Sequence, residues 1–178
     1  AAKIGETEYP TLQAAVDAAT VGQTVVLLKD LSDIGAVTVN TAITIDGNRF
    51  DITGNSCIKI GAQGATIRNI DFNTIHNSIN NPNKDIYNDT VGDLSAIYAS
   101  ALSGSVTITG CTFDNVDWDA IQITPIAGAT ISITNNEFKL TGENTTYGTL
   151  RYVHVQSKQS VDFTVTVTAG HDIDFNAQ

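Results

Sequence analysis

The sequence is poor in basic residues, and this scarcity narrows the range of partners. Nine lysine and arginine residues stand against nineteen aspartate and glutamate residues, which gives a formal net charge of -10 at pH 7. A chain with this balance cannot neutralise a phosphate backbone, so nucleic acid is excluded as a partner. No apolar run is long enough to cross a bilayer, and we therefore expect no membrane insertion.

Methionine is absent, and the chain begins with Ala1 and Ala2. We therefore expect a processed product or an excised domain, whose targeting segment is not part of this sequence. The acidity, the low lysine content and the many Thr and Asn residues favour an extracellular or cell-surface location. We expect a monomer, or one part of a larger multidomain chain.

Cysteine is scarce as well. Cys57 and Cys111 would permit a single disulfide, but two buried thiols that behave as small hydrophobic residues are the simpler interpretation. Neither cysteine has a histidine at ligand spacing, which disfavours a metal site built on them.

An eight-residue pattern recurs four times with the same internal spacing. An apolar residue, Thr or Ser and a second apolar residue are followed two positions later by Gly or Asn, and three positions after that by Phe. The copies are residues 43–50 (ITIDGNRF), 65–72 (ATIRNIDF), 106–113 (VTITGCTF) and 131–138 (ISITNNEF). The alternating triplet is typical of a half-buried strand, and Gly or Asn tolerates the positive φ of a turn. One such unit per repeat predicts a parallel solenoid.

Aligning the copies predicts which side chains lie above one another. We expect three interior columns and one corner column, with Asn side chains bonded along the corner. The interior columns are Ile45, Ile67, Ile108 and Ile133, then Phe50, Phe72, Phe113 and Phe138, then Ile58, Ile97 and Ile121. The corner column is Gly47, Asn69, Gly110 and Asn135. Parallel crossovers are almost always right-handed, so the predicted fold is a single all-β right-handed parallel β-helix.

Residues 9–20 (YPTLQAAVDAAT) form the one amphipathic pattern, which predicts a short capping α-helix that ends before Gly22. Residues 25–28 are continuously apolar, as expected for a strand buried on both sides. The whole chain, 1–178, is predicted as one domain. We divide it into a cap at 1–23, coils at 24–150 with an inserted loop at 74–95, and a closing coil or capping hairpin at 151–178. A shorter excursion is expected at 140–150.

The opening residues 4–28 (IGETEYPTLQAAVDAATVGQTVVLL) resemble the entry module of right-handed parallel β-helix domains in bacterial surface and secreted proteins. The coils that follow resemble the pectin-lyase-like superfamily. That superfamily holds polysaccharide lyases, glycoside hydrolases, adhesins and viral tail proteins, so the resemblance implies a fold and leaves the activity open.

The densest acidic cluster contains Asp114, Asp117 and Asp119 around the single tryptophan, Trp118. If the chain is an enzyme, these three carboxylates are the catalytic candidates, as acid and base on a glycosidic bond or as holders of Ca²⁺ for a lyase. In a binding module, Asp117, Trp118 and Asp119 would contact a sugar. The simplest alternative is a solvated turn between two coils.

Three further carboxylates, Asp85, Asp89 and Asp93, are the only metal-ligand candidates in the loop at 74–95, and Ca²⁺ is the cation they would suit. They lack the spacing of a calcium-binding loop, and loop solubility is the alternative. No cofactor is required by the sequence. His154 is interpreted as a packed or surface strand residue, and Asp46 and Arg68 as a salt bridge between adjacent coils.

These observations favour a non-catalytic structural or ligand-binding module, similar to an adhesin, with carbohydrate or a host or cell-surface protein as partner. Two alternatives stay open. One is a polysaccharide lyase or glycoside hydrolase of the pectin-lyase-like superfamily. The other is a segment of a phage tail fibre or spike.

Overall fold

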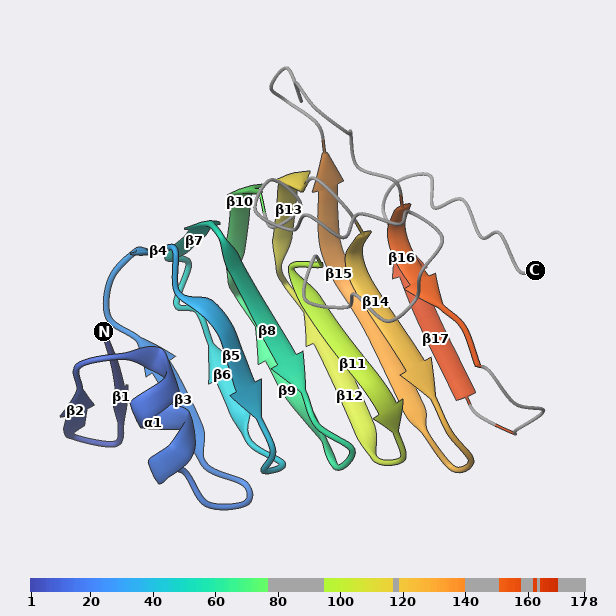
Figure 1. Cartoon of the computed structure of the whole chain (residues 1–178), viewed down its shortest axis with the longest axis horizontal. Coiled ribbons are helices and arrows are strands. Elements are labelled where there is room, and N and C mark those ends of the chain that lie inside the picture. Colours follow the sequence, from blue (N-terminus) through green and yellow to red (C-terminus); the bar gives the residue numbers. More distant parts are fainter. Residues whose placement is uncertain (77–94, 117–118, 140–150, 158–161, 163, 170–178) are drawn as a thin grey trace.

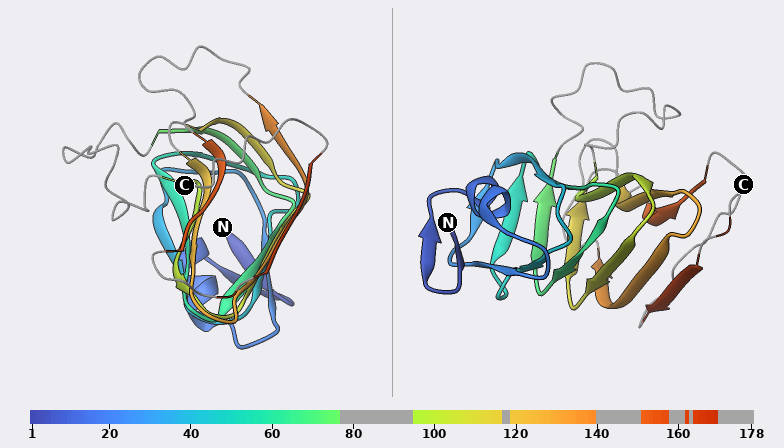
Figure 2. Two further views of the ribbon diagram at one scale, coloured as in Figure 1. Left: turned by 90° about the vertical axis from the view of Figure 1, so that its right-hand side faces the viewer. Right: turned by 90° about the horizontal axis from the view of Figure 1, so that it is seen from below.

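The computed structural model describes residues 1–76, 95–116, 119–139, 151–157, 162 and 164–169. Within them, most strands run parallel to their neighbours in three walls that surround one core (Figures 1 and 2). Wall A contains β3 (Thr24–Leu27), β6 (Thr44–Asp46), β9 (Gly64–Arg68), β12 (Ser105–Thr109), the first half of β15 (Thr130–Lys139) and β17 (Thr164–Ala169). Wall B contains β4 (Leu31–Ser32), β7 (Asp51–Gly54), β10 (Asp71–Ile75), β13 (Thr112–Val116) and the second half of β15. Wall C contains β5 (Gly35–Val39), β8 (Ser56–Ile60), β11 (Ile97–Leu102), β14 (Asp119–Pro125) and β16 (Arg151–Val155).

The chain visits walls A, B and C in turn, so β6 in wall A lies between β3 of the coil before it and β9 of the coil after it. Walls A and B join through β15, which bends at Asn135 and pairs with β12 before the bend and with β13 after it. The parallel organisation that the repeated pattern predicts is therefore confirmed.

Two predicted interior columns are present in full. In wall A, Ile67 is in register with Ile45 on one side and Ile108 on the other, and Ile108 is in register with Ile133. In wall C, Ile97 is in register with Ile58 and Ile121. All of these side chains are buried in the hydrophobic core. The apolar residues of each alternating triplet therefore point inward, because successive side chains of a strand point to opposite faces of the sheet.

The phenylalanine column is present with one correction. Phe72, Phe113 and Phe138 are in register, and their rings stack with centroids 5.0 and 5.1 Å apart. Phe50 lies outside this column, because Ile52 is the residue in register with Phe72.

The cause is the length of the first corner. Asp46 pairs with Arg68, and Asp51 pairs with Asp71. Four residues therefore separate β6 from β7, whereas two separate β9 from β10. Both Asn48 and Arg49 adopt positive φ in this longer corner.

The corner column is confirmed at three of its four positions. Asn69, Gly110 and Asn135 have φ of 53°, 65° and 57°, in the left-handed region that Gly and Asn tolerate. Gly47 does not share this conformation. It is required for space instead, because an added Cβ would collide with the Asn69 carbonyl oxygen and with Cγ1 of Ile70.

The N-terminal helix is shorter than predicted. It spans α1 (Leu12–Ala18), and the Thr11 side chain caps it by accepting a hydrogen bond from the Ala14 N–H. The apolar stripe is correct, since Leu12, Ala15 and Val16 are buried. Gly22 does not end the helix, because Ala19 already has extended backbone; Gly22 turns the chain three residues later.

Two strands that were not predicted precede the helix. They are β1 (Ala2–Ile4) and β2 (Thr7–Tyr9), which pair with each other antiparallel. β1 also pairs antiparallel with β3 and so extends wall A at its N-terminal end. β2 is the end strand of this sheet, at the far left of Figure 1.

The helix closes an exposed strand edge as well as covering apolar side chains. The Gln13 side chain donates from Nε2 to the Thr38 carbonyl at 3.1 Å and accepts from the Thr38 N–H at 2.8 Å. Thr38 lies in β5, the end strand of wall C. One amide side chain thus satisfies backbone groups that an additional strand would otherwise bond.

Three remaining expectations meet mixed outcomes. β3 is buried on one face rather than two, since Val25 and Leu27 are buried and Val26 is partly exposed. The predicted insertion begins too early, because residues 74 and 75 belong to β10. The C-terminal strands form a closing coil, since β16 joins wall C and β17 joins wall A, both in parallel. Residues 77–94 and 140–150 lie outside the described residues.

Candidate functional site

The acidic cluster predicted from the sequence is distributed over two walls. Asp114 lies in β13 of wall B, and Asp119 begins β14 of wall C. Both side chains are buried, so the interpretation of these two residues as a solvated turn is wrong. Asp117 and Trp118, between the two strands, lie outside the described residues, as do Asp85, Asp89 and Asp93.

Asp119 is completely buried and contacts a histidine from the next coil. Its Oδ2 lies 3.1 Å from Nδ1 of His154 in β16, whose side chain is 9% exposed. Pairing of β14 with β16 places Gln122 in register with His154, and Asp119 in register with Arg151. The carboxylate and the imidazole therefore come from neighbouring coils, 35 residues apart in the sequence.

Both ring nitrogens of His154 have a contact. Nε2 lies 3.1 Å from Oε1 of Gln156, two residues further along the chain. A carboxylate and an amide oxygen both accept hydrogen bonds, which suits a ring that carries a proton on each nitrogen. Rotation of the Gln156 amide would instead present N–H to a neutral ring. The arrangement holds the imidazole in place and leaves neither nitrogen directed at solvent.

The outer face of wall C, where His154 lies in register with Gln122, carries a row of buried polar groups. Gln122 and Tyr98 are in register and are both less than 9% exposed, although they alternate with the inward-facing Ile121 and Ile97. The Ser95 hydroxyl donates to Oε1 of Gln122 at 3.3 Å. Nζ of Lys59 lies 5.9 Å from the centroid of the Tyr98 ring. We call Asp119, Gln122, His154 and Gln156 the wall C polar cluster.

Sequence reasoning did not find the role of His154, although a signal was present. Extending the column Ile58, Ile97, Ile121 by one coil places Val153 over Ile121. His154 would then lie beside Gln122 and close to Asp119. The repeated pattern itself ends at residue 138, because the Phe that ends each copy is missing from the last coil.

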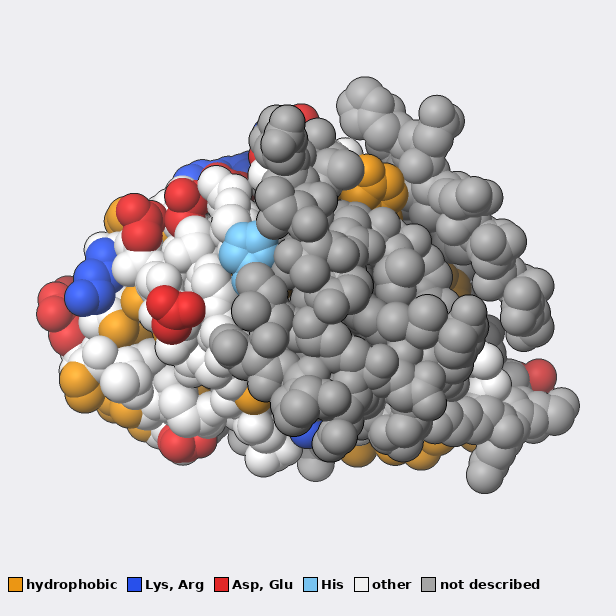
Figure 3. All heavy atoms as spheres, turned by 45° about the horizontal axis from the view of Figure 1, so that its top comes forward, with side chains coloured by type: hydrophobic (Ala, Val, Ile, Leu, Met, Phe, Trp, Pro, Cys, Tyr) orange, Lys and Arg blue, Asp and Glu red, His pale blue; other side chains and the backbone are white. Residues whose placement is uncertain are grey.

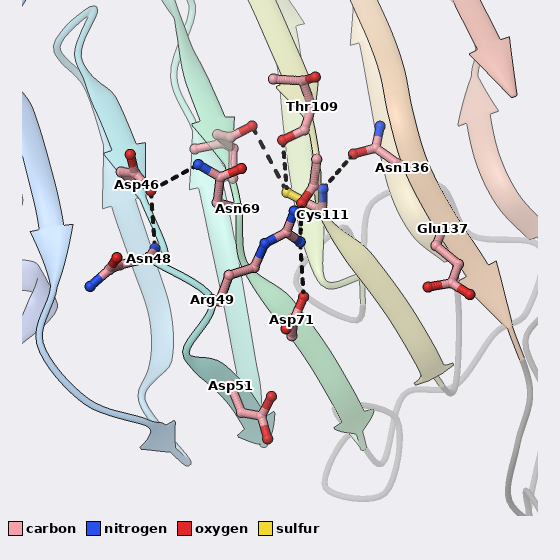
Figure 4. Close-up of polar contacts among 12 residues, drawn as sticks. Asp46, Asn48, Arg49, Asp51, Asn69, Asp71, Thr109, Cys111, Asn136 and Glu137 are labelled. Carbon is pink, nitrogen blue, oxygen red and sulfur yellow. Dashed lines mark hydrogen bonds and ion pairs between the residues drawn. The ribbon is translucent and has the colours of Figure 1, made fainter. Parts of the chain in front are cut away.

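A second polar group occupies the corner between walls A and B (Figure 4). Arg68 bonds Asp46 at 2.8 Å, so the predicted salt bridge between coils is confirmed. Burial on its own would raise the pKa of Asp46, but hydrogen bonds from the Asn48 N–H, from Asn69 and from Arg68 outweigh it and lower that pKa. These contacts join adjacent coils, which indicates a structural role.

The corner continues into a row of carboxylates on wall B. Asp51 is in register with Asp71, and the Asp51 N–H bonds the Asp30 carboxylate. Burial and the nearby charges of Asp30 and Asp71 raise the pKa of Asp51. Arg49 offsets part of this charge, with Nη1 3.6 Å from Asp71. Among the described residues, no group of three or more His, Cys, Asp or Glu side chains is arranged to hold a metal ion.

A cavity of about 390 Å³ opens at the N-terminal end, between α1 and the first strands of walls B and C. Its lining includes Leu12, Leu31, Ile34 and Val37, with Gln13 at one side.

On the face in Figure 3, the blue side chains of Lys and Arg are scattered among the red side chains of Asp and Glu. In the part of the chain that the structure describes, no helix is long and apolar enough to cross a membrane.

Comparisons of the chain with protein-family models, with curated proteins and with solved structures found no match.

Proposed function

We propose that the chain is a right-handed parallel β-helix of the pectin-lyase-like type, acting as a non-catalytic, adhesin-like module of an extracellular or cell-surface protein, with carbohydrate as its ligand. The succession of walls A, B and C in every coil supports the fold. The right-handed winding is supported by the strong preference of crossovers between parallel strands.

The observation that carries the non-catalytic assignment is that both ring nitrogens of the buried His154 contact other side chains. A general base needs a nitrogen directed at the substrate. Here Nδ1 contacts Asp119 and Nε2 contacts Gln156, and the ring is buried. The wall C polar cluster therefore suits the fixing of two coils to each other better than proton transfer.

The ligand-binding assignment concerns the short link from β13 to β14. The link is bounded by two buried residues, Val116 at the end of β13 and Asp119 at the start of β14. A tryptophan ring offers a flat apolar face for a sugar ring, and a carboxylate accepts hydrogen bonds from sugar hydroxyls. This combination on a rigid scaffold is what a carbohydrate-binding surface requires.

The test compares the wild type with Trp118→Ala and Asp117→Asn on a panel of neutral and acidic polysaccharides, by calorimetry, with Ca²⁺ and with a chelator. We expect one class of glycan to bind, and Trp118→Ala to weaken binding about tenfold, or ~1.4 kcal/mol. Asp162→Asn is the charge-matched control for Asp117→Asn, because Asp162 is exposed and lies outside the link. Binding to no glycan, or equal binding by Trp118→Ala, would contradict the proposal.

A second candidate function, cleavage of a polysaccharide, is favoured by one observation. The contact between Asp119 and His154 orients an imidazole as a general base requires, once Gln156 moves away. The same panel separates the two functions. Release of reducing ends or unsaturated uronates by the wild type, and its loss in His154→Gln, would establish the enzyme.

A further inference from the structure

The outward-facing residues of three adjacent strands in wall A are all serine or threonine. In β12 and β15 they alternate with buried residues such as Val106, Ile108, Ile131 and Ile133, which fixes their direction, and β17 is in register with β15. Their side chains are partly or fully exposed. We call this set the hydroxyl grid: Ser105, Thr107 and Thr109 in β12, Thr130, Ser132 and Thr134 in β15, and Thr164 and Thr166 in β17.

Strand pairing arranges the grid in straight columns. The middle column runs through Thr107, Ser132 and Thr166, and it continues in register to Thr66, Thr44 and Thr24 on the preceding coils. Neighbours in a column are about 4.8 Å apart, and neighbours along a strand are about 6.7 Å apart. The result is a regular two-dimensional array on one face of the molecule.

Strand propensity does not account for the array. Thr favours exposed strand positions, and the same preference would act on all three walls. Wall B instead carries Asp51, Asp71, Thr112 and Glu137 in its outward column, and wall C carries Lys59, Tyr98, Gln122 and His154. The repeated hydroxyls are therefore a property of wall A alone.

The grid has a combination of features that binding of a single sugar or of a protein would not require. It contains no formal charge and no aromatic ring. The charged residues Asp46 and Arg68 lie on the two coils before it and neutralise each other. Each Thr presents a methyl group and a hydroxyl at a repeated position. A partner that matches such a surface must itself repeat with the same period.

Hydrogen-bond geometry indicates what that partner is. A water molecule that bonds two hydroxyls at 2.7–2.8 Å, at a tetrahedral angle, holds them about 4.5 Å apart. This is close to the spacing between strands, so one water can bridge each pair of hydroxyls along a column. Oxygen atoms in ice are linked by the same tetrahedral geometry. In one pair, the Thr134 and Thr109 hydroxyls bond directly instead, at 3.3 Å.

We propose that the hydroxyl grid binds the surface of ice, through a layer of water that the grid orders into an ice-like spacing. The methyl groups exclude disordered water between the bridging molecules, and the lack of charge avoids strongly bound hydration shells. This site is separate from the link that contains Asp117 and Trp118, and its test is independent of carbohydrate binding at that link.

The experiment measures incorporation of the protein into a slowly grown ice hemisphere, together with inhibition of ice recrystallisation. The variant is Thr107→Lys, which places a charge in the middle column of the grid. The matched control is Thr112→Lys in wall B of the same coil, where the side chain is also partly exposed. Urea unfolding of both variants verifies that each is folded.

We expect the wild type and Thr112→Lys to enter the ice and Thr107→Lys to be excluded. Exclusion of the wild type, or incorporation of Thr107→Lys at the wild-type level, would overturn the proposal. Retention of the wild type on crystalline cellulose or chitin, with loss of retention in Thr107→Lys and no entry into ice, would assign the grid to a crystalline polysaccharide instead.

Discussion

At the scale of single residues, the interior of the corner between walls A and B changes its chemistry from coil to coil. The successive positions are Ile70, Cys111 and Asn136, all buried. Asn136 accepts from the Cys111 N–H and donates to the Ile108 carbonyl, both at 2.9 Å. The buried side-chain amide of Asn136 thus bonds two backbone groups of the preceding coil, which an apolar side chain could not do.

The thiol of Cys111 should be inert in the folded protein. Burial raises its pKa to about 12, so the thiolate that reacts with disulfide reagents is almost absent at mildly alkaline pH. Cys57 and Cys111 are both buried and form no disulfide, in agreement with the sequence prediction. In a Cys57→Ser background, we expect slow labelling of Cys111 under native conditions and rapid labelling in urea. Rapid labelling of the native protein would show that this corner opens readily.

The stacked phenylalanines provide a test of core packing. Phe113 lies between Phe72 and Phe138, and Phe113→Ala should lower the free energy of unfolding by about 3–5 kcal/mol, from lost burial and the cavity left behind. Phe50→Ala is the control, because Phe50 is only partly buried and outside the column. Urea unfolding measures both. Equal losses in the two variants would mean that the stack contributes nothing beyond ordinary contact.

At the scale of elements, the helix protects a strand edge through one side chain. Gln13→Ala would leave the Thr38 N–H and carbonyl without this partner, at a cost of about 0.5–1.5 kcal/mol. An open end strand also invites pairing with another chain, so self-association should increase. Gln63→Ala, at an exposed turn, is the control. Unchanged unfolding and an unchanged sedimentation profile for Gln13→Ala would show that water replaces the amide fully.

The elements differ in how far the sequence predicts them. The alternating triplets and their corner residues are local patterns, so Ile45, Ile67, Ile108 and Ile133 could be aligned correctly from spacing alone. The longer corner before β7 could not, because the Phe at position 50 imitates the pattern. The contact of Asp119 with His154 depends on pairing between coils, and the sequence indicates it only when the column of Ile58, Ile97 and Ile121 is extended to Val153.

At the scale of the whole molecule, residues 77–94 fall in the sequence between β10 and β11, two strands of the same coil, and each of these strands pairs with a neighbouring coil. β10 pairs with β13, and β8 pairs with β11. Replacing residues 77–93 with a short Gly/Ser linker should therefore preserve a single cooperative unfolding transition, with a midpoint close to that of the wild type. Circular dichroism in urea measures it. A loss of cooperativity would show that the replaced residues belong to the core.

The position of β2 and β17 at opposite ends of wall A has a mechanical consequence. A force applied between them acts across the strands, along the hydrogen bonds that join successive coils. Such a load breaks the bonds of one interface in sequence rather than all together. The domain would extend under tension coil by coil at modest force, and would serve as a compliant spacer rather than a stiff rod.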